Sequence, residues 1–175
     1  AIGRVYYEQL CSDKDGEQIT NIQRSTLQVG KIVALISFIP MLFLACGGDK
    51  VVTLFLGSKW STAGDISLCL AFWSFPTILT QPLIPLFRYL NKQKVLFLYN
   101  LAYSIVAVGT ILLGCLVSRD IYFILSVYAF CGSMVNLAMY THILRLGDVS
   151  IKSFRTYIPL WILSSIILTI RLALL

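Results

Sequence analysis

The clearest shortage in this sequence is charge. Only 13% of the 175 residues are Asp, Glu, Lys or Arg, whereas 58% are hydrophobic and the mean hydropathy is +0.82. A soluble domain is about one quarter charged and about half apolar. The chain therefore has too few charged side chains to cover a soluble fold, and we predict an all-α integral membrane protein.

Ionisable side chains are also missing from long internal stretches. Residues 66–87, 95–117 and 121–141 contain no Asp, Glu, Lys, Arg or His. An enzyme within the membrane needs a general base, a nucleophile or a metal ligand there, and a carboxylate-based proton pump needs acids. We interpret the single histidine, His142, as a polar cap at the end of a span, because ligands and bases occur in groups. We therefore predict no enzyme, no catalytic residue, no metal site and no cofactor.

The cysteines show neither a paired framework nor the CxxC spacing of metal sites. Four of the five fall within or at the ends of apolar segments, namely Cys46, Cys69, Cys115 and Cys131. We expect free structural thiols. The polar residues 1–28 contain no recognisable signal peptide, and we expect the sequence to be a fragment of a longer protein.

Five apolar segments are long enough to cross a bilayer, which takes roughly 20 helical residues. We predict a polytopic bundle over residues 29–175, with spans at about 29–46, 66–87, 95–117, 121–144 and 157–175. Residues 1–28 are interpreted as the end of a preceding helix followed by an amphipathic linker, because Ile19, Ile22 and Leu27 recur at helical spacing.

Proline interrupts two of these spans. Pro40 lies in the first, and Pro76, Pro82 and Pro85 lie in the second. Proline removes a backbone donor and kinks a helix, which a bilayer tolerates where neighbouring groups satisfy the freed carbonyl. We predict helix kinks at these four positions, and bent helices of this kind are more typical of transporters than of passive anchors.

The stretch VVTLFLGSKWSTAG, residues 51–64, separates the first two spans and is too short to cross the membrane. We interpret it as a short helix that lies at the membrane face and is broken at Gly57. Lys59 would reach water and Trp60 would lie at headgroup depth. An ordinary interfacial loop is the alternative.

Basic residues are distributed unevenly between the two sides of this topology. Ten lie on the side of the N-terminal segment and four on the other side. Because cytoplasmic loops carry an excess of Lys and Arg, we place residues 1–28 and the loops 88–94 and 145–156 in the cytoplasm. The stretch 51–64 then faces outward.

Two groups of polar side chains are candidates for a substrate cavity or gate. Four cations are predicted at or near the cytoplasmic face: Arg4, Arg24, Lys31 and Arg88. They can form a basic ring that holds a phosphate, or they can simply snorkel to anionic headgroups. Gln81 and Asn100 can line a water-filled cavity, because an unpaired amide facing lipid is costly. An interhelical hydrogen bond is the alternative for each amide.

The run FLGSKWSTAG resembles the lFG-x-x-W-x-x-A region of the polysaccharide and O-antigen flippases, with Phe55, Gly57, Trp60 and Ala63 matching the pattern. These flippases belong to the multidrug/oligosaccharidyl-lipid/polysaccharide exporter superfamily. The opening AIGRVYYEQL is similar to a helix end of the same family, although Glu8 stands where proline is usual. The resemblance covers the whole chain as topology but only these two stretches as sequence.

The resemblance implies two pseudo-symmetric helical lobes around a cationic cavity, of which this chain supplies most of the C-terminal lobe. It implies alternating-access flipping of an undecaprenyl-pyrophosphate-linked oligosaccharide across a bacterial inner membrane. The cationic role carries over to Arg4 and, on a weaker match, to Arg88. The implied partners are membrane lipids and the lipid-linked substrate, with a polysaccharide polymerase or chain-length machinery as further candidates.

Two other functions stay open. One is a drug or small-solute exporter of the same superfamily, and the other is a membrane enzyme of polysaccharide assembly. Nucleic acid is not expected as a partner, because the basic residues cluster in loops between apolar spans, where lipid headgroups account for them.

Overall fold

The structure is a computed structural model that describes residues 2–12, 18–43, 47, 49–117 and 120–149. All regular secondary structure in these residues is helical, which confirms the predicted all-helical class. The α-helices are α1 (Ile2–Ser12), α2 (Gln18–Phe43), α3 (Asp49–Leu56), α4 (Ser61–Thr80), α5 (Pro85–Tyr89), α6 (Gln93–Val117) and α7 (Ile121–Leu146), and the 3-10 helices are η2 (Ser58–Trp60) and η3 (Gln81–Leu83).

Three helical stretches of the described chain are long and apolar enough to cross a membrane. They are Cys69–Tyr89, Gln93–Val117 and Ile121–Leu146. Their positions agree with the predicted spans 66–87, 95–117 and 121–144, and 25 residues of α6 extend about 37 Å at the α-helical rise. The chain therefore has the features of a helical membrane protein. The predicted fifth span, 157–175, lies outside the described residues.

The helix that contains the start of the first predicted span, 29–46, begins earlier than residue 29. The helix α2 is continuous from Gln18 to Phe43, so the expected boundary between residues 28 and 29 falls inside one helix. The polar residues before Val29 include no proline, and Gln, Arg and Leu favour a helix, so nothing interrupts it there. The predicted linker and the first span therefore form a single element, with Pro40 inside it.

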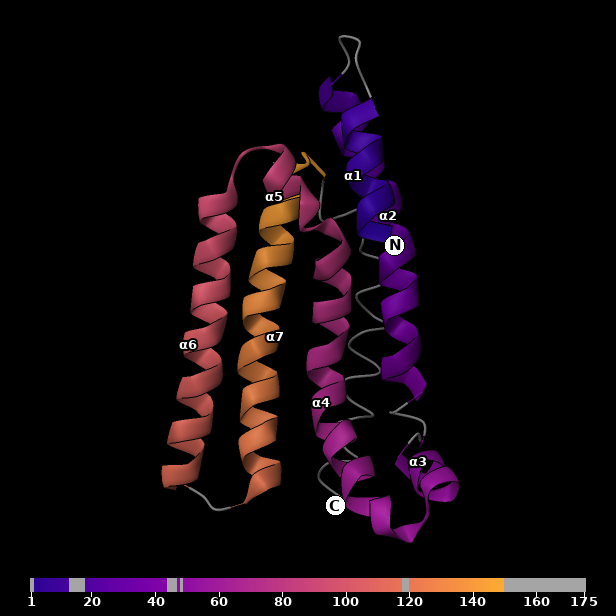
Figure 1. The fold of residues 1–175 in the computed structure, drawn as a ribbon, viewed down its shortest axis with the longest axis vertical. Helices are drawn as coiled ribbons and strands as arrows, with labels where there is room; N and C mark the ends of the chain where they lie inside the picture. The colour runs from indigo at the N-terminus through magenta and orange to yellow at the C-terminus, as the bar shows by residue number, and fades with distance from the viewer. Residues whose placement is uncertain (1, 13–17, 44–46, 48, 118–119, 150–175) are drawn as a thin grey trace.

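The long helices run side by side along the longest axis of the molecule (Figure 1). The helix α7 packs against both α4 and α6, and α2 packs on the other side of α4. The face of α7 that meets its neighbours carries small residues, among them Ala129, Gly132 and Ser133, all of which are buried. A Cβ atom added to Gly132 would lie 3.0 Å from Cδ1 of Trp73, so the close contact with α4 requires this glycine.

Several of the largest fully buried side chains lie where α1, α5 and the C-terminal end of α7 come together. Tyr6 of α1 is fully buried there, and its hydroxyl is 2.7 Å from Oγ1 of the buried Thr26 of α2. Burial raises the pKa of Tyr6 to about 12. Leu83, Leu86, Phe87 and Ile143 are also fully buried in this cluster.

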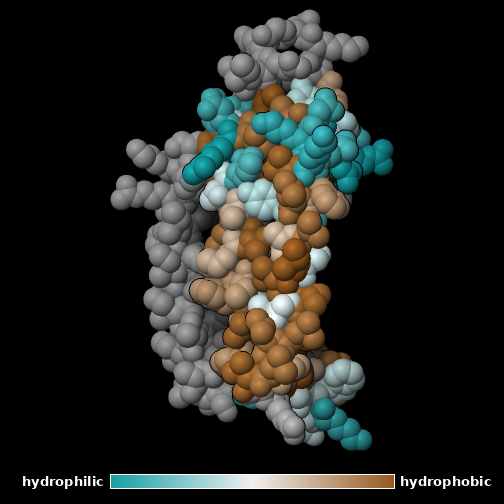
Figure 2. All heavy atoms as spheres, turned by 90° about the vertical axis from the view of Figure 1, so that its left-hand side faces the viewer, coloured by the Kyte–Doolittle hydropathy of each residue, from teal (hydrophilic) through white to brown (hydrophobic). Residues whose placement is uncertain are grey.

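We call this the basic end, because described cations gather there: Arg4, Arg24, Arg88, Lys92, Lys94 and Arg145. Below it, the outer face of α6 is almost entirely apolar and exposed. Figure 2 shows this face as a hydrophobic surface under a hydrophilic upper end. An exposed apolar face of this length suits contact with lipid tails, whereas a soluble protein would not leave it uncovered.

The prolines divide the second span into segments. Pro76 lies inside α4, Pro82 lies in η3, and Pro85 begins α5. The chain from Ser61 to Tyr89 thus follows one path through an α-helix, a 3-10 turn and a short second α-helix. This places the polar residues Thr77 and Gln81 in a region of loosened helix.

Candidate functional site

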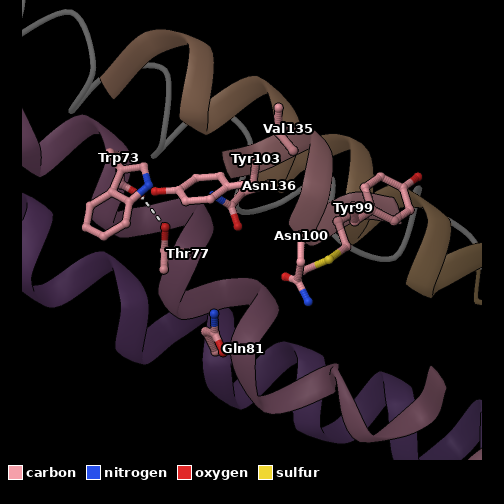
Figure 3. Close-up of a pocket in the computed structure, with 9 residues that line it drawn as sticks. Trp73, Thr77, Gln81, Tyr99, Asn100, Tyr103, Val135 and Asn136 are labelled. Carbon is pink, nitrogen blue, oxygen red and sulfur yellow. Dashed lines mark hydrogen bonds between the residues drawn. The ribbon is translucent and has the colours of Figure 1, made fainter. Parts of the chain in front are cut away.

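A cavity of about 100 Å³ lies between α4, α6 and α7 (Figure 3). The structure brings Gln81 and Asn100, the two amides singled out from the sequence, to the same cavity. Its described lining consists of Trp73, Thr77, Gln81, Tyr99, Asn100, Tyr103, Val135, Asn136 and Met139. None of these side chains carries a charge at neutral pH.

The α4 wall follows from helical spacing. Trp73, Thr77 and Gln81 are four residues apart, so they lie on one face of the path from α4 into η3. The Thr77 hydroxyl donates to the Trp73 carbonyl oxygen at 2.9 Å, which leaves its own oxygen free to accept. The Gln81 side chain is exposed at the end of α4 and reaches the cavity from that end.

The α6 wall consists of two aromatic side chains, Tyr99 and Tyr103, and the amide of Asn100. Tyr103 and Tyr128 of α7 share a hydrogen bond of 2.6 Å between their hydroxyls. Tyr99 makes a hydrogen bond of 3.2 Å with Nδ1 of His142, which lies nearer the basic end of α7. The two tyrosines are thereby anchored to α7, whereas the exposed amide of Asn100 between them has its polar group available.

Asn136 completes the α7 wall and was missed in the sequence analysis. Its side chain is only 7% exposed, and Nδ2 donates to the Gly132 carbonyl oxygen at 3.0 Å. Figure 3 shows its oxygen directed into the space between Thr77, Gln81 and Asn100. A signal existed in the sequence, because Asn136 follows Ala129 and Ser133 at helical spacing on the small-residue face.

The four predicted cations do not line this cavity. Arg4 forms an ion pair with Glu8 at 3.0 Å, and its side chain is 86% exposed. Arg24, Lys31 and Arg88 are also exposed, on α2 and α5. The structure therefore separates the two groups of candidates: the exposed amides of Gln81 and Asn100 line the cavity, and the four cations lie on the surface outside its lining.

The stretch 51–64 folds as a short helix and a turn at the opposite end of the bundle, as Figure 1 shows. The helix α3 ends before Gly57, which has φ 90° and ψ 167°, a conformation nearly restricted to glycine. Phe55 is 82% exposed and Trp60 is 53% exposed. Ala63 lies in the first turn of α4 and is half-buried.

The cavity can bind neutral polar groups. Amide and hydroxyl groups donate and accept hydrogen bonds without charge, and aromatic rings stack on flat apolar faces. The described residues contain no group of three His, Cys, Asp or Glu side chains that could hold a metal ion.

No protein-family model, curated protein or solved structure matches the chain. The coarse class comes from the molecule itself. It is an all-helical protein with three described helices able to cross a membrane and an uncharged polar cavity between them.

Proposed function

We propose that the chain is part of a flippase that moves a lipid-linked oligosaccharide across the bacterial inner membrane by alternating access. The substrate would be an O-antigen or other polysaccharide repeat unit on undecaprenyl pyrophosphate. The chain would form most of the C-terminal lobe, with five spans, and the predicted spans 29–46 and 157–175 would complete the set.

The observation that carries this proposal is the uncharged cavity between membrane helices. Three amides, from Gln81, Asn100 and Asn136, converge there with tyrosine and tryptophan rings. Amides that hydrogen-bond hydroxyls, combined with aromatic faces, suit the neutral saccharide part of such a substrate. A cavity without carboxylates is a poor match to a cationic drug.

The basic end supports the other half of the proposal. A pyrophosphate carries negative charge, and exposed Arg and Lys side chains are suited to attract it. The described cations near the basic end outnumber those on α3 and η2, which are Lys50 and Lys59. By the positive-inside rule the basic end would be cytoplasmic, where the lipid-linked substrate would be collected. The loops 88–94 and 145–156 would then face the cytoplasm, and residues 51–64 would face outward.

The test uses the full-length protein in proteoliposomes loaded with a fluorescent polyprenyl-pyrophosphate oligosaccharide. We expect protein-dependent movement of the label between leaflets, reduced at least tenfold when Asn100 is replaced by alanine. The matched control is Gln28→Ala, because Gln28 is an exposed amide on α2 that does not line the cavity.

The same vesicles distinguish the alternatives. Transport of a cationic dye with no movement of the labelled oligosaccharide would favour a drug or small-solute exporter. Chemical turnover of an activated sugar or acyl donor would favour an enzyme of polysaccharide assembly. Either result would contradict the proposed function.

A further inference from the structure

Pro76 cannot donate the hydrogen bond that a regular helix residue makes to the carbonyl one turn earlier. In a regular helix the N–H of residue 76 would donate to the Phe72 carbonyl oxygen, and proline has no N–H. The hydroxyl of Ser133 in α7 donates to this carbonyl at 3.2 Å. Ser133 is fully buried, so this hydrogen bond crosses the interface between the two helices away from water.

The same hydroxyl has a second acceptor in its own helix. The Ser133 Oγ atom lies 2.6 Å from the Ala129 carbonyl oxygen and 3.2 Å from that of Phe72. A hydroxyl has a single hydrogen. The hydrogen can therefore point to either carbonyl oxygen, and the contact within α7 is the shorter of the two.

Thr80 repeats this arrangement in the opposite direction. Its Oγ1 atom lies 2.5 Å from the Pro76 carbonyl oxygen in its own helix and 3.4 Å from the Asn136 carbonyl oxygen in α7. Thr80 is also fully buried. Ser133 of α7 and Thr80 of α4 thus each lie within hydrogen-bond distance of a carbonyl oxygen of the other helix. For each hydroxyl the contact within its own helix is shorter than the contact across the interface.

Both hydroxyls are close to the cavity walls. Thr80 lies between Thr77 and Gln81 in sequence, and Asn136 lies less than one turn after Ser133. A shift of the α4 segment that follows Pro76 relative to α7 would move Thr77 and Gln81 relative to Asn136. Hydrogen bonds that hold this segment against α7 would therefore also fix the positions of these cavity residues.

We propose that Ser133 and Thr80 are positioning residues of a two-position contact between α4 and α7, with Pro76 as its pivot. In one position both hydroxyls donate across the interface and hold residues 77–89 against α7. In the other position each donates within its own helix, and this segment is released. The contact depends on no particular substrate, so it can exist whether or not the protein transports oligosaccharides.

Hydrogen–deuterium exchange of the full-length protein in lipid nanodiscs tests this contact. Ser133→Ala removes one cross-interface donor, and we expect backbone amides in peptides covering residues 77–89 to exchange about threefold faster. Pro76→Ala supplies the missing N–H to the Phe72 carbonyl. In that background Ser133→Ala should change exchange of the same peptides by less than 1.5-fold, as an order-of-magnitude bound.

The matched control is Ser37→Ala. Ser37 is a fully buried serine in α2 whose hydroxyl donates to the Ala34 carbonyl oxygen in its own helix. Its replacement should leave exchange in residues 77–89 unchanged. Thr80→Val, which keeps the side-chain shape, should reproduce the effect of Ser133→Ala from the other helix. Ser133→Cys, a weak donor of similar size, replaces the alanine variant if that variant does not fold.

Two results would overturn the proposal. One is an equal acceleration by Ser133→Ala with and without Pro76, which would mean that the serine only fills space. The other is unchanged exchange of residues 77–89 in both Ser133→Ala and Thr80→Val. A failure of oligosaccharide transport in vesicles would leave this exchange result unaffected, so the two proposals fail separately.

Discussion

The cavity and the basic end use polar residues in opposite ways. At the cavity, amides and hydroxyls lie between membrane helices without any charged side chain among the lining residues. At the basic end, arginines and lysines are exposed, and the buried polar groups, Tyr6 and Thr26, are paired with each other. The free-energy cost of leaving water explains the difference. A charged side chain in the bilayer interior costs much free energy, whereas an amide there costs little if it faces a cavity.

The largest expected effect comes from adding a charge to the cavity. Asn136→Asp places a carboxylate where the side chain is 7% exposed, and we expect a loss of about 3 kcal/mol in stability. The measurement is the thermal unfolding midpoint of purified protein. Asn91→Asp, the same change at an exposed position beside Lys92, is the control and should leave the midpoint nearly unchanged.

Equal shifts in the unfolding midpoint for Asn136→Asp and Asn91→Asp would contradict the difference between the cavity and the basic end in their tolerance of charge. The contrast would also weaken if Asn136→Asp were as stable as the parent protein, since that would indicate a cavity that is open to bulk water.

The next effect concerns the buried pair of the basic end. Tyr6→Phe leaves the Thr26 hydroxyl buried without its partner, and we expect a cost of about 1–3 kcal/mol. Tyr103→Phe at the cavity removes a hydroxyl pair that is only partly buried, so about 0.6 kcal/mol is expected there. Denaturation curves for both variants give the comparison, and a larger cost for Tyr103→Phe would contradict it.

Alkaline pH should weaken the basic end. The pKa of Tyr6 is raised from 10.0 to about 12, so the folded state holds this proton more tightly than the unfolded state. The resulting stabilisation is fully present below pH 10 and is lost as the pH rises toward 12, on the order of 2 kcal/mol in total. Unfolding midpoints between pH 9 and pH 12 should fall less steeply for Tyr6→Phe than for the parent protein.

The smallest effect on stability is expected for Arg4→Ala. The ion pair with Glu8 is exposed, and such pairs contribute little to folding. We expect an unchanged unfolding midpoint together with weaker binding of polyprenyl pyrophosphate by the full-length protein. Unchanged binding would mean that Arg4 only contacts headgroups.

The apolar runs of the sequence predicted the three described spans well, because length and hydropathy alone decide which helices can cross a bilayer. Gln81 and Asn100 were predicted to face a cavity because an amide facing lipid is costly, and both line it.

Other features depend on contacts that a single sequence does not reveal. The packing of α2 against both α1 and α4 joins residues that are far apart in the sequence. The distance between the cations and the cavity depends on how α1 and α5 lie at the basic end. Asn136 follows Ala129 and Ser133 at helical spacing, but the sequence does not show that this face of α7 meets α4 and α6.

Water access at residue 100 tests the central claim most directly. In a background without the native cysteines, Asn100→Cys and Leu101→Cys place thiols on neighbouring residues of α6, both exposed but only the first lining the cavity. Thiols react with maleimide as thiolates, which need water. With the full-length protein in membranes, we predict that a water-soluble maleimide labels the cysteine at 100 at least tenfold faster than the one at 101. Equal labelling rates would contradict a polar cavity between membrane helices.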